Sequence, residues 1–178
     1  MNIILAAVIS LDGKITRHNE TGAISWNSIE DKKHFARLIA KSDAIIMGRK
    51  TYEAARKIIV LSPRRLRIVL TRAPEKYKKE AVSRELEFSK ESPRQIIRRL
   101  QKMGRRKILI VGGGEIYALF LREGLVSRIE LTIEPKIFGT GGNFLAPLQM
   151  KKEFRLVSAR RLNRRGTLLL TYDVISTT

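Results

Sequence analysis

The sequence has 178 residues, with no cysteine, one tryptophan and two histidines, His18 and His34. Without cysteine, disulfide bonds and thiolate chemistry are excluded. Two histidines offer little for a transition-metal site, so we expect no metal. The apolar runs are too short for a membrane span. The chain enters a strand pattern at Asn2 without the basic start and cleavage site of a signal peptide, which predicts a cytoplasmic protein.

Acidic residues are also scarce. Only 17 Asp and Glu stand against 36 Lys and Arg, which gives a formal net charge of +19. Such a surplus favours polyanions, whether nucleic acid, a nucleotide cofactor or an acidic substrate. It is equally consistent with a general bias of the surface. No zinc finger, RNA-binding aromatic motif or helix-turn-helix is recognisable, so charge alone does not decide the function.

The residues that are present have the pattern of one globular α/β domain over 1–178. Hydrophobic residues make up 43% of the chain, and a continuous apolar run over 2–9 is typical of a strand buried in a parallel sheet. Short strands then alternate with helices, and the chain closes with an antiparallel hairpin, which predicts a mainly parallel sheet flanked by helices. We expect strands over 2–9, 44–47, 67–71, 86–88, 107–111, 127–134, 154–162 and 167–175, and helices over 28–40, 51–57, 92–104 and 112–121.

One carboxylate is placed unusually in this pattern. Asp31 and Phe35 lie four residues apart on the apolar stripe of the helix that begins near Ser28. The pattern Ser28-Ile29-Glu30-Asp31 fits a capping box, in which the acid reaches back to the cap amide, and local pattern favours this interpretation. The alternative is a carboxylate in an apolar pocket, with a raised pKa and walls from Trp26 and Phe35, that binds a heterocycle edge.

Three strand ends carry residues suited to phosphate. Gly48, the turn Thr71-Arg72 and the run Gly112–Gly114 each follow an expected strand, and ligands of open α/β sheets lie at such carboxyl ends. The glycines expose backbone N–H groups, while Arg49 and Lys50 add positive charge. The spacing is not the GxGxxG of a Rossmann unit. A dinucleotide with a 2′-phosphate would account for these cations. The polar loop from Ser10 to Gly22 is long enough to act as a lid.

Together these motifs, in this order, resemble the dihydrofolate reductase superfamily, which includes folate reductases and the reductase domain of riboflavin biosynthesis. The spacing of Trp26, Asp31 and Phe35 is similar to that of the tryptophan, catalytic acid and pterin-packing phenylalanine of folate reductases. The run Gly112–Gly114 resembles the glycine turn beside the nicotinamide, where the family has a cis Gly-Gly bond. The resemblance implies a dihydrofolate reductase-like three-layer fold and an NADPH-dependent oxidoreductase.

The resemblance also implies a role for individual residues. Asp31 is the implied catalytic residue, which holds the pterin edge and promotes protonation. Arg65 occupies the place of the arginine that grips the folate glutamate. The implied substrate-binding residues are Leu5, Ala6, Trp26, Phe35, Arg65 and Thr132. The implied NADPH-binding residues are Ala7, Gly48, Arg49, Lys50, Thr51, Leu70, Thr71, Arg72, Val111, Gly112, Gly113, Gly114, Glu115, Ile116 and Tyr117.

The substrate has two candidates. The main expectation is reduction of 7,8-dihydrofolate to tetrahydrofolate, with hydride to C6 and a proton to N5, which would place the protein in one-carbon metabolism. The segments Ser10–Ile15 and Glu134–Gly142, however, look more like the riboflavin branch. The alternative is therefore a 5-amino-6-(5-phosphoribosylamino)uracil reductase, for which a homodimer is expected. A nucleic-acid-binding protein on the same scaffold is a distant third, because the cofactor motifs are intact.

Overall fold

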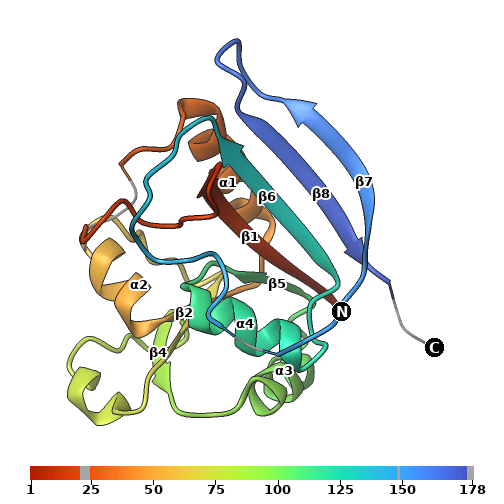
Figure 1. Ribbon diagram of the computed structural model, residues 1–178. Helices are drawn as coiled ribbons and strands as arrows, with labels where there is room; N and C mark the ends of the chain where they lie inside the picture. The colour runs from red at the N-terminus through yellow and green to blue at the C-terminus, as the bar shows by residue number, and fades with distance from the viewer. Residues whose placement is uncertain (21–24, 148, 176–178) are drawn as a thin grey trace.

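The computed structural model describes residues 1–20, 25–147 and 149–175. Its centre is one eight-stranded sheet in the order β4-β3-β2-β5-β1-β6-β8-β7 (Figure 1). The strands are β1 (Asn2–Ser10), β2 (Ala44–Gly48), β3 (Leu66–Leu70), β4 (Leu86–Ser89), β5 (Lys107–Ile110), β6 (Arg128–Glu134), β7 (Phe154–Arg161) and β8 (Leu168–Val174).

The strands β4, β3, β2, β5, β1 and β6 pair in parallel, whereas β8 pairs antiparallel with both β6 and β7. The mainly parallel sheet with an antiparallel edge hairpin is confirmed. The apolar strand β1 lies between β5 and β6, and its register places Val8 beside Thr132 and Ser10 beside Glu134. The carboxyl ends of the parallel strands therefore gather at one edge of the sheet, here called the carboxyl edge.

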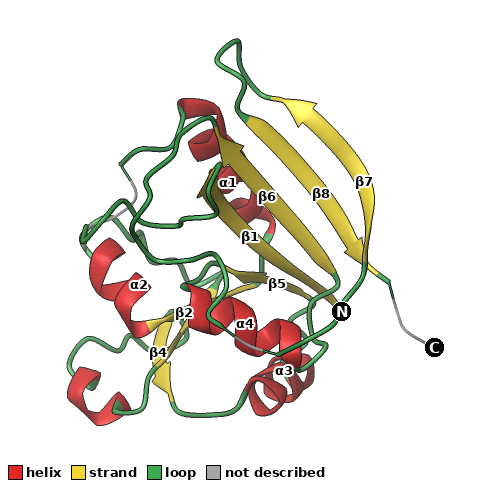
Figure 2. Ribbon diagram, viewed as in Figure 1, coloured by secondary structure: helices red, strands yellow, loops and turns green. Residues whose placement is uncertain are grey.

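Helices cover both faces of this sheet (Figure 2). Ile96 of α3 (Pro93–Lys102) and Phe120 of α4 (Gly114–Arg122) pack in one apolar cluster. Leu38 of α1 (Ile29–Lys41) and Tyr52 of α2 (Arg49–Ala55) pack in another. None of the helices formed by the described residues is long and apolar enough to cross a membrane. The helices are α1 (Ile29–Lys41), α2 (Arg49–Ala55), the short 3-10 helix η1 (Pro74–Tyr77), α3 (Pro93–Lys102) and α4 (Gly114–Arg122).

The expected elements all occur, with differences at their ends. The helix expected over 51–57 begins at Arg49, because β2 runs through Gly48 and that glycine is itself the N-cap residue. The start of α3 is as expected, with Ser92 and Gln95 forming a complete capping box. The expected lid packs on the segment 136–142, as Ile15 N donates to Gly142 O over 2.8 Å. Its last residues, at 21 and 22, lie outside the described residues.

Candidate active site

The acid singled out from the sequence is enclosed at the start of α1. Asp31 is only 5% exposed, and its carboxylate accepts a hydrogen bond from Asn27 Nδ2 over 2.6 Å and another from the Thr132 hydroxyl. Burial raises the pKa of Asp31, the two hydrogen bonds act in the opposite direction, and the nearby charge of Glu134 adds to the rise. A carboxyl group held in this way titrates nearer to neutral pH than an exposed aspartate, which suits proton-transfer chemistry.

Of the two hydrogen bonds that the predicted capping box of Ser28 and Asp31 requires, one forms and the other does not. The Ser28 side chain does cap α1, since its Oγ accepts from Asp31 N over 3.2 Å. The cap amide, however, donates to Glu134 Oε1 over 2.7 Å and not to Asp31. A distant strand supplies the acceptor that the local pattern assigned to the helix, which leaves the Asp31 carboxylate available for another role.

Glu134 is a second buried acid that the sequence patterns did not single out. It ends β6, is 3% exposed, and accepts from Thr167 Oγ1 over 2.8 Å in addition to the Ser28 amide. It therefore ties β6, β8 and the start of α1 together beside Asp31. The sequence did hold a signal for Glu134, similar to the one for Asp31. It is a carboxylate at a strand position whose side chain is expected to point into the core.

The aromatic residues expected as walls occupy different surroundings. Trp26 is 6% exposed and packs edge-to-face on Phe138, with ring centroids 4.9 Å apart, while its backbone oxygen accepts from Lys136 Nζ. Phe35 is half-buried and packs against the cluster that contains Ala6. Trp26 thus anchors the 135–143 segment through Phe138, a partner that sequence analysis missed because the two residues lie far apart in the chain.

Two of the three expected strand ends meet directly at the carboxyl edge. Gly48 N donates to Gly112 O over 2.7 Å, which joins the ends of β2 and β5, and the Gly112–Gly113 peptide bond is cis, as the resemblance implied. Gly113 has space for a flat group beside it, since a Cβ atom there would meet only Thr51 Oγ1 at 3.5 Å and Ile15 Cδ1 at 3.8 Å. The missing side chains let backbone and ligand approach closely.

The third strand end and the cations lie next to this pair. β3 pairs with β2 so that Leu70 faces Gly48, and Thr71 N donates to Ser89 O over 3.0 Å. The Arg49 guanidinium is held by Glu53 Oε2 at 2.6 Å, whereas Lys50 and Arg72 are exposed. A phosphate bound here would meet Lys50 and Arg72 without competition from Glu53.

Several expected site residues lie in or next to the core beside the carboxyl edge. The Tyr117 hydroxyl donates to Ala6 O over 2.6 Å, and burial raises the pKa of this tyrosine. Leu5 is fully buried in the cluster under α3 and α4, so only its backbone can contribute. Of the other expected cofactor residues, Ala7, Val111, Gly114 and Ile116 are partly buried at β1, the end of β5 and the start of α4, and Glu115 is exposed.

Arg65 lies apart from these residues. It precedes β3 at the opposite end of the sheet, and its Nε donates to Ser42 O over 3.3 Å. Within the described residues no group of three or more acids and histidines could hold a metal ion. The arrangement combines a buried acid, a glycine-lined surface and exposed cations at one edge, which suits binding of a heterocycle beside a phosphorylated cofactor.

Comparison with known proteins identifies the family. Residues 1–168 match the family model described as the RibD C-terminal domain. The uncharacterised protein YwjB of Bacillus subtilis is 26% identical over 166 residues, which cover 90% of this chain and 92% of that protein.

Solved structures have the same fold. A pyrimidine reductase-like protein from Corynebacterium diphtheriae has 16% sequence identity and a TM-score of 0.78, with 99% of this chain and 92% of that chain covered. A diaminohydroxyphosphoribosylaminopyrimidine deaminase/5-amino-6-(5-phosphoribosylamino)uracil reductase from Thermotoga maritima has 20% identity and a TM-score of 0.70, with 98% and 56% covered. Because the family match spans nearly the whole sequence, the chain belongs to the RibD C-terminal domain family and is an oxidoreductase.

Proposed function

We propose that the protein is an NADPH-dependent pyrimidine reductase that acts on an aminopyrimidine bearing a ribosyl phosphate, of the kind used in riboflavin biosynthesis. Of the two substrates expected from the sequence, this one has the better support, because the family and the Thermotoga protein belong to that chemistry. Nothing in the comparisons supports dihydrofolate, tetrahydrofolate synthesis or one-carbon metabolism. The cytoplasmic location and the single-domain boundary stay predictions from the sequence.

The enclosed carboxylate of Asp31 is the structural observation behind this proposal, and the family match decides between the two heterocycles. An aminopyrimidine edge presents adjacent N–H donors, and a buried carboxylate is a strong acceptor for such a pair. Asn27 and Thr132 fix the carboxylate in place, so the substrate would meet an oriented acceptor. Burial raises the pKa of Asp31, which makes this carboxyl group easier to protonate than an exposed aspartate.

The carboxyl edge fits NADPH, which supplies a hydride when bound. Gly113 leaves open space beside its backbone, with Thr51 and Ile15 as the nearest neighbours, which suits the approach of a nicotinamide ring. Lys50 and Arg72 are the exposed cations that would hold phosphate groups. The role expected for Arg65 as a clamp for folate glutamate has no separate support, because the comparisons favour a substrate without that group.

A two-substrate assay tests the proposal. NADPH oxidation is followed with 5-amino-6-(5-phosphoribosylamino)uracil and, separately, with 7,8-dihydrofolate. We expect turnover with the aminopyrimidine phosphate and at most a trace with dihydrofolate. Efficient turnover of dihydrofolate alone would instead restore the folate assignment. Direct binding of NADPH, measured by quenching of the Trp26 fluorescence or by calorimetry, separates a failure of the substrate assignment from a failure of the cofactor assignment.

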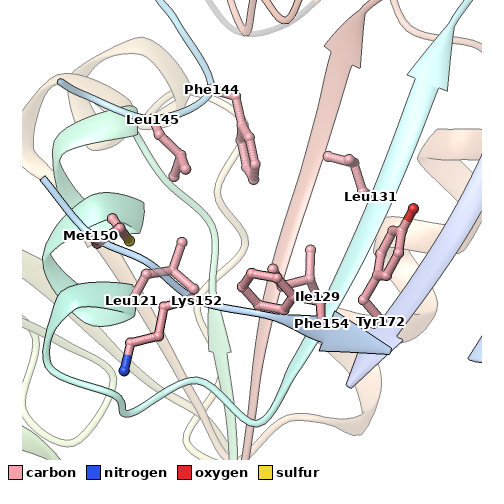
Figure 3. A pocket seen from close by; sticks show the side chains of 9 residues that line it. All are labelled: Leu121, Ile129, Leu131, Phe144, Leu145, Met150, Lys152, Phe154 and Tyr172. Atoms are coloured by element: carbon pink, nitrogen blue, oxygen red, sulfur yellow. The ribbon is translucent and has the colours of Figure 1, made fainter. Parts of the chain in front are cut away.

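We also propose a homodimer, formed through the sheet face that α4 leaves partly open. A cavity of about 310 Å³ lies there (Figure 3), lined by side chains from β6, β7, β8 and α4 and by residues 144, 145, 150 and 152. Nearly all of them are apolar, and a face of this kind is typical of an interface between subunits. The lining residues are Leu121, Ile129, Leu131, Phe144, Leu145, Met150, Lys152, Phe154 and Tyr172.

A pair of variants on one strand tests the dimer. Leu156 is 51% exposed and pairs with Tyr172, which places it on the cavity side of β7, whereas Ser158 pairs with Thr171 on the other side. Leu156→Arg is expected to convert the dimer to a monomer in sedimentation equilibrium, and Ser158→Arg is expected to leave it intact. A wild-type protein that sediments as a monomer at all concentrations would refute the proposal.

A further inference from the structure

The opposite edge of the sheet, where β2, β3 and β5 begin, gathers three turns into one strongly basic surface. Hydrogen bonds join the turns: Arg105 Nη1 donates to Arg64 O over 2.8 Å, and the Asp43 carboxylate accepts from the backbone N–H groups of Arg106 and Lys107, each over 2.8 Å. We call this surface the basic edge. The cations carried by these turns and by the element ends beside them are Lys41, Arg64, Arg65, Arg67, Arg105, Arg106 and Lys107.

Two acids, Asp43 and Glu85, lie beside these cations. Burial acts to raise the pKa of Asp43, but the hydrogen bonds from Arg106 N and Lys107 N outweigh it, and the pKa is lowered overall. Asp43 is therefore an ionised group already occupied by two backbone donors. The side chains of Arg64, Arg106 and Lys107 are exposed. Exposed cations alone are ordinarily just a solvated surface.

Arg67 differs from these exposed cations because it is buried. It is the second residue of β3, is 5% exposed, and lies between Ile45 of β2 and Leu86 of β4. Its Nη1 is buried without any hydrogen-bond partner among the described residues. Burial and the charge of Arg65 both lower the pKa of Arg67, while Glu85 raises it, yet Glu85 forms no ion pair with it. An unpaired buried guanidinium is costly, and such groups ordinarily have a partner.

The other buried charges of the molecule show what is missing here. Asp31 and Glu134 are about as enclosed as Arg67, and each has at least two hydrogen-bond donors. Only Arg67 among these three has none. The group best suited to it is an oxyanion, because a guanidinium binds planar or tetrahedral oxygen groups with two parallel N–H donors. A multiply charged phosphate matches the surplus of cations better than a single carboxylate does.

We propose that the basic edge binds a phosphate group, with the Arg67 guanidinium as the buried contact and Arg64, Arg106 and Lys107 as the exposed rim. This site is distinct from the candidate active site, because it lies at the amino ends of the strands whose carboxyl ends hold Gly48 and Gly112. It does not depend on the identity of the reductase substrate. The phosphate can belong to a small molecule or to a nucleic-acid backbone, and both present the same chemistry.

Calorimetric titration with pyrophosphate at constant ionic strength tests the site. Wild-type protein is expected to bind, and Arg67→Gln is expected to weaken binding about tenfold, since the variant loses a charge-assisted hydrogen bond to the anion. Arg160→Gln, which removes an exposed cation on the hairpin, is the matched control and should leave affinity unchanged. Equal affinity in wild type and Arg67→Gln overturns the proposal.

Two further variants keep the test decisive. If Arg67→Gln does not fold, the exposed pair Arg64→Gln and Arg106→Gln replaces it, and the same loss of affinity is expected. Arg72→Gln removes a cation of the carboxyl edge. Loss of pyrophosphate binding in Arg72→Gln alone would assign the ion to the cofactor region and overturn the site. Repeating the titration with a short single-stranded oligonucleotide distinguishes the sources: a stronger loss for the oligonucleotide than for pyrophosphate in Arg67→Gln indicates a nucleic-acid backbone.

Discussion

The buried charged side chains at the two ends of the sheet differ in whether they have hydrogen-bond partners. At the carboxyl edge, Asp31 and Glu134 are enclosed, and each has hydrogen bonds from side chains or backbone of other elements. At the basic edge, Arg67 is equally enclosed and lacks any partner within the described residues. A satisfied buried carboxylate is a preorganised acceptor, whereas an unsatisfied buried cation indicates a missing anion. Changing one charge at each end therefore has different expected consequences.

The largest effect is expected from Asp31→Asn. Positioned proton transfer contributes about 10²–10⁴-fold to rate, so turnover of the aminopyrimidine phosphate should fall by roughly that factor. Helix α1 should remain, because Ser28 Oγ caps the backbone N–H of residue 31 and not its carboxylate. The measurement is kcat from NADPH oxidation, with circular dichroism to verify the fold. Asp43→Asn, at the other edge, is the control and should retain turnover within about twofold of wild type, in the same assay.

The next effect concerns stability at the basic edge. Arg67→Met should raise the free energy of unfolding in phosphate-free buffer, because an unsatisfied buried polar group costs about 1–3 kcal/mol. For a domain of this size each kcal/mol shifts Tm by about 2–4 °C. Arg99→Met is the contrasting variant: Arg99 contacts Glu87 and Glu91, so its loss should lower Tm. If Arg67→Met instead lowers Tm, the guanidinium has a structural partner and the comparison between the two edges fails.

The sheet and part of the candidate site were predictable from the sequence alone. The parallel sheet, its hairpin and the convergence of Gly48 with Gly112 follow from local signals, namely apolar runs, alternation and glycine at strand ends. Asp31 was identifiable because an acid on an apolar stripe breaks the helical pattern. Its hydrogen bond with Thr132 did not follow from local pattern, because Thr132 is about a hundred residues away, and only the family resemblance placed the two in one site.

The substrate and Arg67 were beyond sequence patterns for a different reason. Arg67 occupies a strand position where an arginine reads as surface, and only the packing of Ile45 and Leu86 beside it shows that it is buried. The spacing of Trp26, Asp31 and Phe35 favoured folate, yet the same carboxylate serves any heterocycle with adjacent N–H donors. Short motifs thus specified the acceptor and not the ligand, and the family match was needed to choose between the two substrates.

Stability as a function of pH gives a smaller effect. The pKa of Asp31 is raised by burial, so its neutral form is favoured in the folded state. The stability that this group contributes is fully present below its unfolded pKa and is lost as the pH rises through the raised folded pKa. Asp31→Asn removes that dependence. In thermal melts, the Tm of Asp31→Asn relative to wild type should therefore increase from acid to neutral pH. A Tm difference that does not change with pH would mean that the pKa of Asp31 is not shifted.

The smallest effects come from the two residues that tune Asp31. Thr132→Val removes a hydrogen bond that favours the charged form, so the pKa of Asp31 should rise further. Glu134→Gln removes a neighbouring negative charge, so that pKa should fall. The pH at which kcat/KM reaches half its maximum should move in opposite directions in the two variants, as should the carbon-13 chemical-shift titration of the Asp31 carboxyl. Shifts in the same direction would show that repacking, and not charge, controls this acid. Glu134→Gln retains one oxygen that can accept from the Ser28 amide, whereas an NH₂ group replaces the oxygen that accepts from Thr167 Oγ1.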